Sequence, residues 1–240
     1  MKIAIIDGDS ILYLASKDSI EESIINVNSI MNSIMKETGS SHYYLFLSKS
    51  PYFRNSISED YKVKRTLPTL KYIKSLKGYL EEEFKAVSYD KLEADDLVSF
   101  ASMESSRQAI EYVICSIDKD VLKQTPGHHF NYKTYEQGYT SIDAAIEFIF
   151  IQTCMGDSTD NIKGIPKVGE VKAKEALKNL TMDQMLLKTF SLYLEYYISL
   201  GNSIFEFQKN FRLVYLLKNN EDFLREVGYV PSLPDPRTLF

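Results

Sequence analysis

Short apolar runs alternate with longer helix-like segments over the first part of the chain. Three runs are typical of buried β-strands, because they are rich in β-branched and aromatic residues and end at polar positions: residues 2–6, 42–47 and 112–117. An apolar stripe with spacings of three and four predicts an amphipathic helix, formed by Ile20, Ile24, Val27, Met31 and Ile34. Helical patterning returns at residues 92–103. This alternation predicts an α/β fold with a central, mostly parallel sheet flanked by helices.

The second part of the chain has a different pattern. Residues 84–88 are a candidate short strand and residues 127–139 a candidate strand or hairpin, after which the periodicity is helical at residues 144–155, 172–179, 182–199 and 204–218. Three late prolines predict an irregular ending. We therefore expect an α/β core at residues 1–155, a helical part at 156–220 and an irregular tail at 221–240.

The composition is that of an ordinary globular protein, with 44% hydrophobic and 25% charged residues among 240. No apolar run approaches the ~20 residues that span a bilayer, and the run at residues 3–6 is too short for a signal peptide. We expect a cytoplasmic protein without a membrane partner. Cys115 and Cys154 lack C-x-x-C spacing, which argues against zinc and disulfides and favours core thiols.

Charge is unevenly distributed along this acidic chain, whose net charge is -5. Residues 49–77 carry eight Lys and Arg residues against only Glu59 and Asp60. Such a basic segment is either a solvated helix face or a surface that meets a polyanion.

Acidic residues recur where the predicted elements begin or end. Asp7 follows the first strand, and Asp118 and Asp120 follow the third. A predicted helix opens with Glu93, Asp95 and Asp96. A predicted apolar helix closes with Asp157 and Asp160. Ligands of open parallel sheets bind at the carboxyl ends of the strands, so we expect these side chains to converge. Asp118 and Asp120 point to one side if extended, and the last pair would share a helical face.

So many carboxylates in one cleft need counter-ions, because their repulsion would otherwise force several to bind protons. Hard oxygen ligands favour Mg²⁺ or Mn²⁺ over zinc, and two such ions ~4 Å apart can stabilise both oxygens in phosphodiester hydrolysis. Each pair by itself could instead serve as a helix cap or dipole complement. The histidines His42, His128 and His129 have no setting typical of a ligand or a catalytic triad.

Five motifs resemble, in this order, those of the 5′-nuclease or flap endonuclease family: Asp7-Gly-Asp-Ser10, Tyr61-Lys-Val-Lys-Arg65, Glu93-Ala-Asp-Asp96, Asp118-Lys-Asp120 and Gly156-Asp-Ser-Thr-Asp-Asn161. That family includes the 5′-nuclease domain of bacterial DNA polymerases and the free-standing 5′-3′ exonucleases of bacteria and bacteriophages. A sixth motif, running from Asn161 to Gly169 with Lys172-Ala173 after it, resembles the family's duplex-binding helix-three-turn-helix, expected at residues 161–179. The resemblance covers roughly residues 2–180.

The resemblance implies a PIN-like 5′-nuclease fold with a helical arch, which the region 49–80 would supply. Lys62 and Arg65 would then meet the scissile phosphate, and Tyr61 could stack on a base. All eight carboxylates are implied as ligands of two Mg²⁺ or Mn²⁺ ions, with Asp7, Asp95 and Asp120 counted as catalytic. The resemblance also implies a potassium ion at the turn of the helix-three-turn-helix. Contacts with duplex DNA are expected there from five residues: Gly164, Lys167, Val168, Gly169 and Lys172.

The expected activity is two-metal-ion hydrolysis of DNA at a 5′ flap, nick or 5′ end, or of an RNA–DNA hybrid, by a monomer in replication or repair. The chain departs from the family where Ser48 follows the second strand in place of a usual aspartate, and where Val171 precedes Lys172. Two alternatives remain. One is a DNA-binding protein that has lost cleavage, suggested by Ser48. The other is a phosphatase of the haloacid dehalogenase type, which leaves the second and third acidic motifs and the basic segment unexplained.

Overall fold

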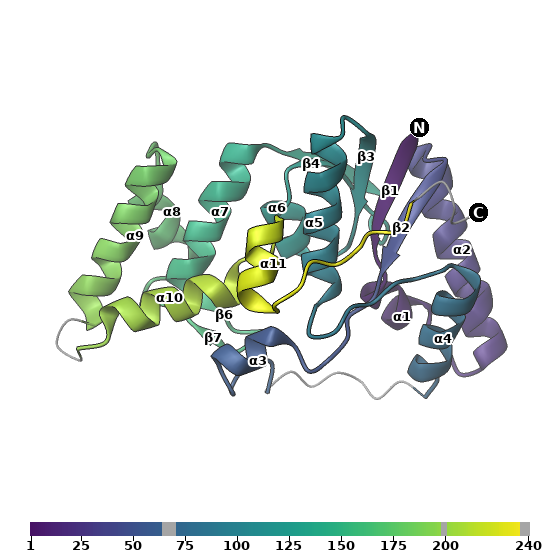
Figure 1. Ribbon diagram of the computed structural model, residues 1–240, viewed down its shortest axis with the longest axis horizontal. Coiled ribbons are helices and arrows are strands. Elements are labelled where there is room, and N and C mark those ends of the chain that lie inside the picture. The colour runs from purple at the N-terminus through teal and green to yellow at the C-terminus, as the bar shows by residue number, and fades with distance from the viewer. Residues whose placement is uncertain (64–70, 198–200, 236–240) are drawn as a thin grey trace. The chain divides into compact units, whose positions relative to one another are not determined.

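The computed structural model describes residues 1–63, 71–197 and 201–235. These residues form two compact units (Figure 1). The sheet unit comprises Met1–Tyr52, Pro68–Ser141 and the segment from Leu216 onward, and the helical unit comprises Phe53–Leu67 and Ile142–Tyr215. The division does not follow the ranges expected from the sequence, because the helix before residue 155 packs within the helical unit and the chain's last part returns to the sheet unit.

The sheet unit is built on a five-stranded sheet in the order β2-β1-β3-β4-β5. Its strands are β1 (Lys2–Asp7), β2 (His42–Phe46), β3 (Glu111–Cys115), β4 (Gly127–Asn131) and β5 (Glu136–Thr140). Pairing is parallel from β2 to β4, and β4 and β5 form an antiparallel hairpin. The predicted α/β fold and the hairpin are thus confirmed. The candidate strand at residues 84–88 contributes one isolated bridge, between Val87 and Phe46.

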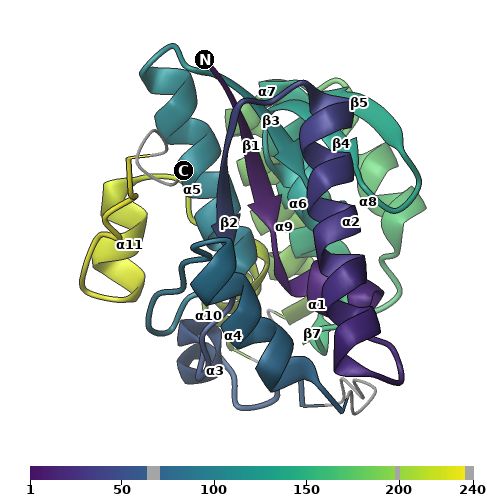
Figure 2. The same ribbon diagram turned by 90° about the vertical axis from the view of Figure 1, so that its right-hand side faces the viewer.

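Helices cover both faces of this sheet (Figure 2). Period-two alternation along β1 turns Ala4 and Ile6 toward one face and Ile3 and Ile5 toward the other, and all four are fully buried. The first face packs against α1 (Asp9–Ala15), α2 (Ile20–Thr38) and α4 (Ile73–Glu83). The second is covered by α5 (Ala94–Arg107), with α6 (Lys119–Gln124) beside it. The predicted irregular tail is wrong in part, because it contains α11 (Asn220–Glu226).

The helical unit packs four longer elements around one core: α7 (Ile142–Met155), α8 (Glu170–Leu177), α9 (Met182–Tyr197) and α10 (Ser203–Val214). A short helix, α3 (Phe53–Ile57), and a two-stranded hairpin of β6 (Gly156–Asp157) and β7 (Ile162–Lys163) complete it. Tyr193 is fully buried at its centre and donates to the carbonyl of Thr153, while the Asn210 side chain donates to the Tyr193 hydroxyl.

Two glycines shape the hairpin that follows α7. Gly156 has φ of 72° and its backbone lies against Gly164, so a Cβ on Gly156 would stand 2.3 Å from the Gly164 nitrogen. A Cβ on Gly164 would stand 2.2 Å from the carbonyl carbon of Met155. Only glycine fits both positions, and the left-handed turn at Gly156 ends the helix. The predicted shared helical face of Asp157 and Asp160 is therefore wrong.

Candidate active site

Asp7 is the buried acid at the carboxyl end of β1. Its side chain is 2% exposed and accepts hydrogen bonds from the Asp9 amide (3.1 Å) and from the hydroxyls of Ser10 (3.1 Å) and Ser116 (3.0 Å). Burial, together with the nearby charges of Asp9 and Asp118, raises the pKa of Asp7 to about 7. Carboxylates from the ends of β1 and β3 therefore act on one another here, as expected for the carboxyl edge of a parallel sheet.

The motif Glu93-Ala-Asp-Asp96 begins α5 in the same unit. Glu93 occupies the N-cap position and is buried, Asp96 is fully buried, and Asp95 is half-buried. The positive end of the helix dipole stabilises the negative charges of Asp95 and Asp96, which lie in the first turn of α5. The Asp96 Oδ1 atom also accepts from the amide of Leu217, at 3.1 Å. Sequence reasoning missed this contact, because nothing in the local pattern links residues so far apart in the chain.

Ser48 caps α5 from the end of β2. Its Oγ accepts from the amide of Ala94 at 2.8 Å, whereas the Glu93 side chain makes no capping bond. The amide of Ser48 donates to Asp9 Oδ1 at 3.0 Å, and its carbonyl accepts from the ammonium of Lys77 at 2.9 Å. Ser48 stands where the family usually has an aspartate, and its hydroxyl has a structural role there as a helix cap.

Asp118 and Asp120 lie at the start of α6. Asp118 is the N-cap, and its Oδ1 accepts from the amide of Asp120 at 2.7 Å. The capping alternative is confirmed for Asp118. The geometry expected for an extended pair is wrong, since Asp120 already belongs to the first helical turn.

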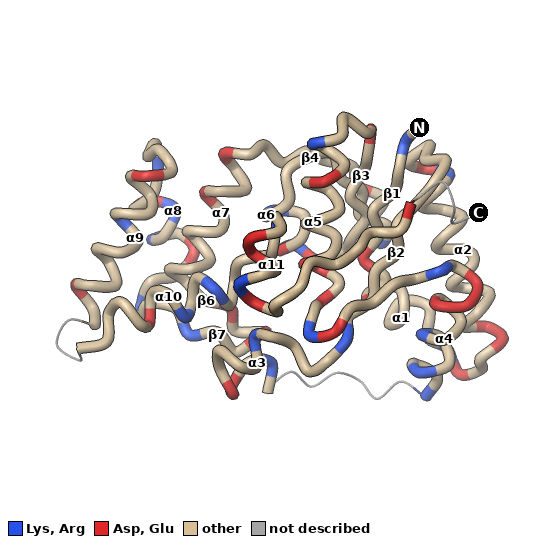
Figure 3. The backbone as a smooth tube through the Cα atoms, viewed as in Figure 1, with Lys and Arg blue, Asp and Glu red and all other residues tan. Residues whose placement is uncertain are grey.

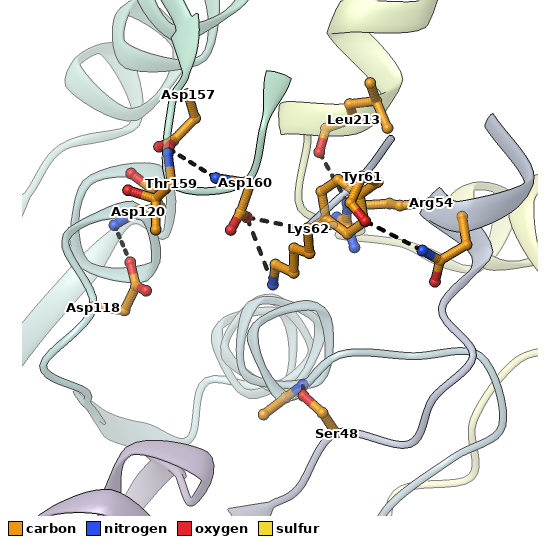
Figure 4. Close-up of polar contacts among 12 residues, drawn as sticks. Ser48, Arg54, Tyr61, Lys62, Asp118, Asp120, Asp157, Thr159, Asp160 and Leu213 are labelled. Atoms are coloured by element: carbon orange, nitrogen blue, oxygen red, sulfur yellow. Dashed lines mark hydrogen bonds and ion pairs between the residues drawn. The ribbon is translucent and has the colours of Figure 1, made fainter. Parts of the chain in front are cut away.

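The last acidic pair lies in the helical unit (Figure 4). Asp157 Oδ1 accepts from the amides of Thr159 (2.7 Å) and Asp160 (3.3 Å), which shapes the turn between β6 and β7. Asp160 Oδ2 lies 3.5 Å from the Lys62 ammonium and accepts from the Tyr61 hydroxyl at 3.3 Å. The carboxylate of Asp160 is therefore paired with Lys62 of the basic segment.

The basic segment is anchored by backbone contacts as well. The Lys62 amide donates to the carbonyl of Asp160 at 2.9 Å, and Lys62 takes a left-handed backbone conformation with φ of 58°. Tyr61 is only 4% exposed, so stacking on a base would require its ring to leave this packing. Arg65 lies outside the described residues.

Arg54 belongs to the basic segment by sequence but is 1% exposed. Its Nε donates to the carbonyl of Leu213 at 2.9 Å and its Nη2 to that of Tyr215 at 2.7 Å, both at the carboxyl end of α10. There the cation meets the negative end of the helix dipole. Figure 3 shows where the basic and the acidic residues lie along the described backbone.

The predicted duplex-binding turn joins β7 to α8. Lys167 has φ of 65°, the Val168 amide donates to the carbonyl of Ile165, and the Lys172 ammonium donates to the carbonyl of Lys167 at 3.0 Å. Gly169 is the N-cap of α8, and no side chain caps this end of the helix. The backbone at Gly169 is open, since no atom would lie within 4 Å of a Cβ built there. An anion can approach such a helix start.

The ligand atoms at these positions suit a hard divalent cation, because all are carboxylate oxygens. The pKa of Asp7 is raised mainly by burial and then by the charges of Asp9 and Asp118, and a cation would relieve that repulsion. Donors of the chain itself hydrogen-bond to the side chains of five of these acids: Asp7, Asp96, Asp118, Asp157 and Asp160. As arranged, no three His, Cys, Asp or Glu side chains in the described part of the chain are grouped so that they could hold one ion. The donor chemistry fits Mg²⁺ or Mn²⁺, and binding would require these side chains to change partners.

Residues 2–145 match the family model described as "5'-3' exonuclease, N-terminal resolvase-like domain". The chain belongs to this family. It is 31% identical over 150 residues to a 5'-3' exonuclease of Buchnera aphidicola subsp. Schizaphis graminum, covering 57% of this chain and 52% of the relative. It is also 25% identical over 213 residues to DNA polymerase I of Geobacillus stearothermophilus, covering 77% of this chain and 24% of the polymerase. The match thus spans about half the length of the Buchnera exonuclease and about a quarter of the length of the polymerase.

The fold of this chain is similar to that of a solved structure. A complex of the bacteriophage T5 D15 flap endonuclease with DNA and metal ions matches with a TM-score of 0.71 at 19% identity, over 90% of this chain and 89% of that one. Membership in the family makes the phosphatase alternative wrong. Among the described residues, no helix is long and apolar enough to span a membrane.

Proposed function

We propose that this chain is a divalent-metal-dependent 5′ nuclease that hydrolyses phosphodiester bonds of DNA as a 5'-3' exonuclease or flap endonuclease. The observation that carries the proposal is Asp7, a buried acid whose pKa is raised to about 7 partly by neighbouring carboxylates, in a chain of the exonuclease family. Such crowding has no evident value for stability, and a cation is the natural partner of the ionised cluster.

Two Mg²⁺ or Mn²⁺ ions are the proposed cofactors, with Asp7, Asp95 and Asp120 closest to the chemistry. Bound ions would stabilise the charge on the attacking and leaving oxygens. The proposed ligands are Asp7, Glu93, Asp95, Asp96, Asp118, Asp120, Asp157 and Asp160. We assign Lys62 and Arg65 to the scissile phosphate, where cations meet developing negative charge.

For the helical unit we propose duplex binding through the turn before α8. The left-handed residue Lys167, the open backbone at Gly169 and the side chain of Lys172 support this role, with Gly164 and Val168 shaping the turn. A potassium ion bound at the turn is part of the proposal. The proposed substrate is DNA with a 5′ flap, a nick or a 5′ end, or an RNA–DNA hybrid, cut by a monomer in the cytoplasm during replication or repair.

The test is incubation of the purified protein with 5′-labelled flap and blunt duplex, with Mg²⁺ or with chelator. Chelator-sensitive cutting near the 5′ junction is expected. Asp157→Asn should abolish cutting, while the matched variant Asp143→Asn, at an exposed position of α7, should cut like the wild type. Release of label with chelator present would contradict a metal-dependent mechanism.

The second candidate is a binding protein that has lost cleavage. What favours it is Ser48, whose hydroxyl is engaged by the Ala94 amide at the start of α5. Duplex affinity without cutting at any concentration of Mg²⁺ or Mn²⁺ would make this candidate the better account.

A further inference from the structure

Ser116 directly follows β3 and lies beside the acid that ends β1. The two strands are parallel neighbours whose register pairs Ile6 with Cys115, so Asp7 and Ser116 are the next residues along the two chains. Ile6 and Cys115 pack in the same core cluster. Because side chains alternate along a strand, Asp7 and Ser116 both turn to the other face of the sheet. The strand pairing therefore places the Ser116 hydroxyl against the Asp7 carboxylate.

The Ser116 hydroxyl joins two acidic motifs through two hydrogen bonds. Its Oγ donates to Asp7 Oδ2 at 3.0 Å and accepts from the amide of Asp118 at 3.0 Å. The Asp118 carboxylate in turn accepts from the amide of Asp120 at 2.7 Å. A hydroxyl that accepts from an amide is polarised and donates more strongly, so the two bonds of Ser116 reinforce each other. Ser116 thus links the Asp7 carboxylate to the segment that carries Asp118 and Asp120.

Ser116 lies on the buried side of the Asp7 carboxylate. It is fully buried, whereas the two other residues that donate to this carboxylate, Asp9 and Ser10, are half-buried. A cation that arrives from solvent would displace the donors of Asp9 and Ser10 first, because they lie on the accessible side. The Ser116 hydroxyl can keep its hydrogen bond while the carboxylate changes its other partners.

A buried serine does not need a carboxylate to satisfy its hydroxyl. Ser102 is also fully buried, and its hydroxyl donates to the carbonyl of Val98, four residues earlier in α5, at 2.8 Å. The bond from Ser116 instead reaches an acid 109 positions away in the chain. A buried hydroxyl also costs free energy that an alanine at the same position would avoid. These contacts favour a role in holding Asp7 over simple satisfaction of a buried polar group.

We propose that Ser116 is a positioning residue for the acidic site, whose hydroxyl fixes the orientation of the Asp7 carboxylate and ties it to the start of α6. This inference rests on the proposed function, since it treats Asp7 and Asp118 as ligands of a divalent cation. Ser116 would act as a partner that orients a metal ligand without touching the metal. It lies outside the six motifs on which the family resemblance depends.

The test measures Mn²⁺ affinity without nucleic acid, from the electron paramagnetic resonance signal of free Mn²⁺, together with the melting temperature in chelator. Ser116→Ala removes the hydroxyl and should weaken Mn²⁺ binding about tenfold, the usual scale for losing a partner of a metal ligand. Ser116→Cys fills the same space but donates only weakly, so it should lose nearly as much affinity. It takes the place of Ser116→Ala if that variant does not fold.

Two control variants separate positioning from a loss of stability. Ser102→Ala removes an equally buried hydroxyl, one that donates to a helix carbonyl. Tyr132→Phe removes the hydroxyl that donates to the backbone carbonyl of Asp7 at 2.8 Å, so it loosens the same strand end without taking a donor from the carboxylate. Both variants should lower the melting temperature without changing Mn²⁺ affinity.

Unchanged Mn²⁺ affinity in the Ser116 variant, or an equal loss in Ser102→Ala or Tyr132→Phe, would overturn the proposal. A wild type that binds Mn²⁺ but does not cut DNA would refute the proposed function and leave this inference standing. Metal-dependent cutting by the wild type, with unchanged Mn²⁺ affinity in Ser116→Ala, would support the proposed function and overturn this inference.

Discussion

Replacing Ser48 separates the helix cap that the structure shows at this position from the metal-ligand role that the family resemblance implies for it. The Ser48 hydroxyl accepts from the Ala94 amide at 2.8 Å, and the Glu93 side chain makes no capping bond to α5. Ser48→Ala leaves that amide without its partner, at a cost of about 1 kcal/mol. For a protein of this length, a loss of that size lowers the melting temperature by about 2–4 °C.

Ser48→Asp should keep the cap, because aspartate caps helices about as well as serine. It also adds a carboxylate beside Asp9, whose Oδ1 accepts from the amide at position 48. We expect this variant to be less stable than the wild type in chelator and to be stabilised more by Mg²⁺. Its half-maximal Mg²⁺ concentration for cleavage should fall by about tenfold, equivalent to roughly 1.4 kcal/mol of added binding energy. The wild type should cleave better with Mn²⁺ than with Mg²⁺.

The assays are thermal unfolding in chelator and a titration of cleavage rate against Mg²⁺ for wild type, Ser48→Ala and Ser48→Asp. Ser48→Ala is the matched control, since it loses the cap without gaining a charge, and its Mg²⁺ requirement should match the wild type. If Ser48→Asp leaves the requirement unchanged or raises it, position 48 is not a ligand position, or Asp9 already supplies the carboxylate. If Ser48→Ala melts like the wild type, the capping argument fails.

Three further predictions concern other residues of the site. Asp120→Asn should abolish cleavage and preserve duplex binding in a gel-shift assay, because it removes a ligand and a negative charge; retained cleavage would exclude Asp120 as a ligand. Lys62→Ala should mainly lower the cleavage rate, whereas Lys167→Ala and Lys172→Ala should weaken duplex affinity and flatten its salt dependence, and equal effects on affinity alone would contradict this division. Burial and nearby charges raise the pKa of Asp7 to about 7 in the folded protein, so the Asp7 carboxyl ionises at a lower pH in the unfolded chain than in the folded one. Metal-free protein should therefore lose up to about 4 kcal/mol of stability as the pH rises from about 4 to 7. Denaturant unfolding in chelator measures this, and stability that rises over this range in the wild type but not in Asp7→Asn would refute it.

The sequence by itself determined the fold class and the order of the acidic motifs. Period-two and period-3.6 patterns report which face of a local element is buried, and that information is complete within a few residues. The strand at residues 2–6 and the helical stripe from Ile20 to Ile34 were therefore predictable, as was the opening of α5 by Glu93, Asp95 and Asp96. The motifs likewise indicated the family, and the match of residues 2–145 to the family model confirms it.

Only the tertiary structure decided what the individual side chains contact. Gly156 ends α7 with a positive φ that its neighbour Gly164 accommodates, so Asp157 and Asp160 lie in a turn. A basic residue of the charged segment, Arg54, is buried against the end of α10. Leu217 binds Asp96 across 121 positions of the chain. Hydrophobic periodicity contains no such information, because contacts between distant segments depend on how whole elements pack and which buried polar groups they satisfy.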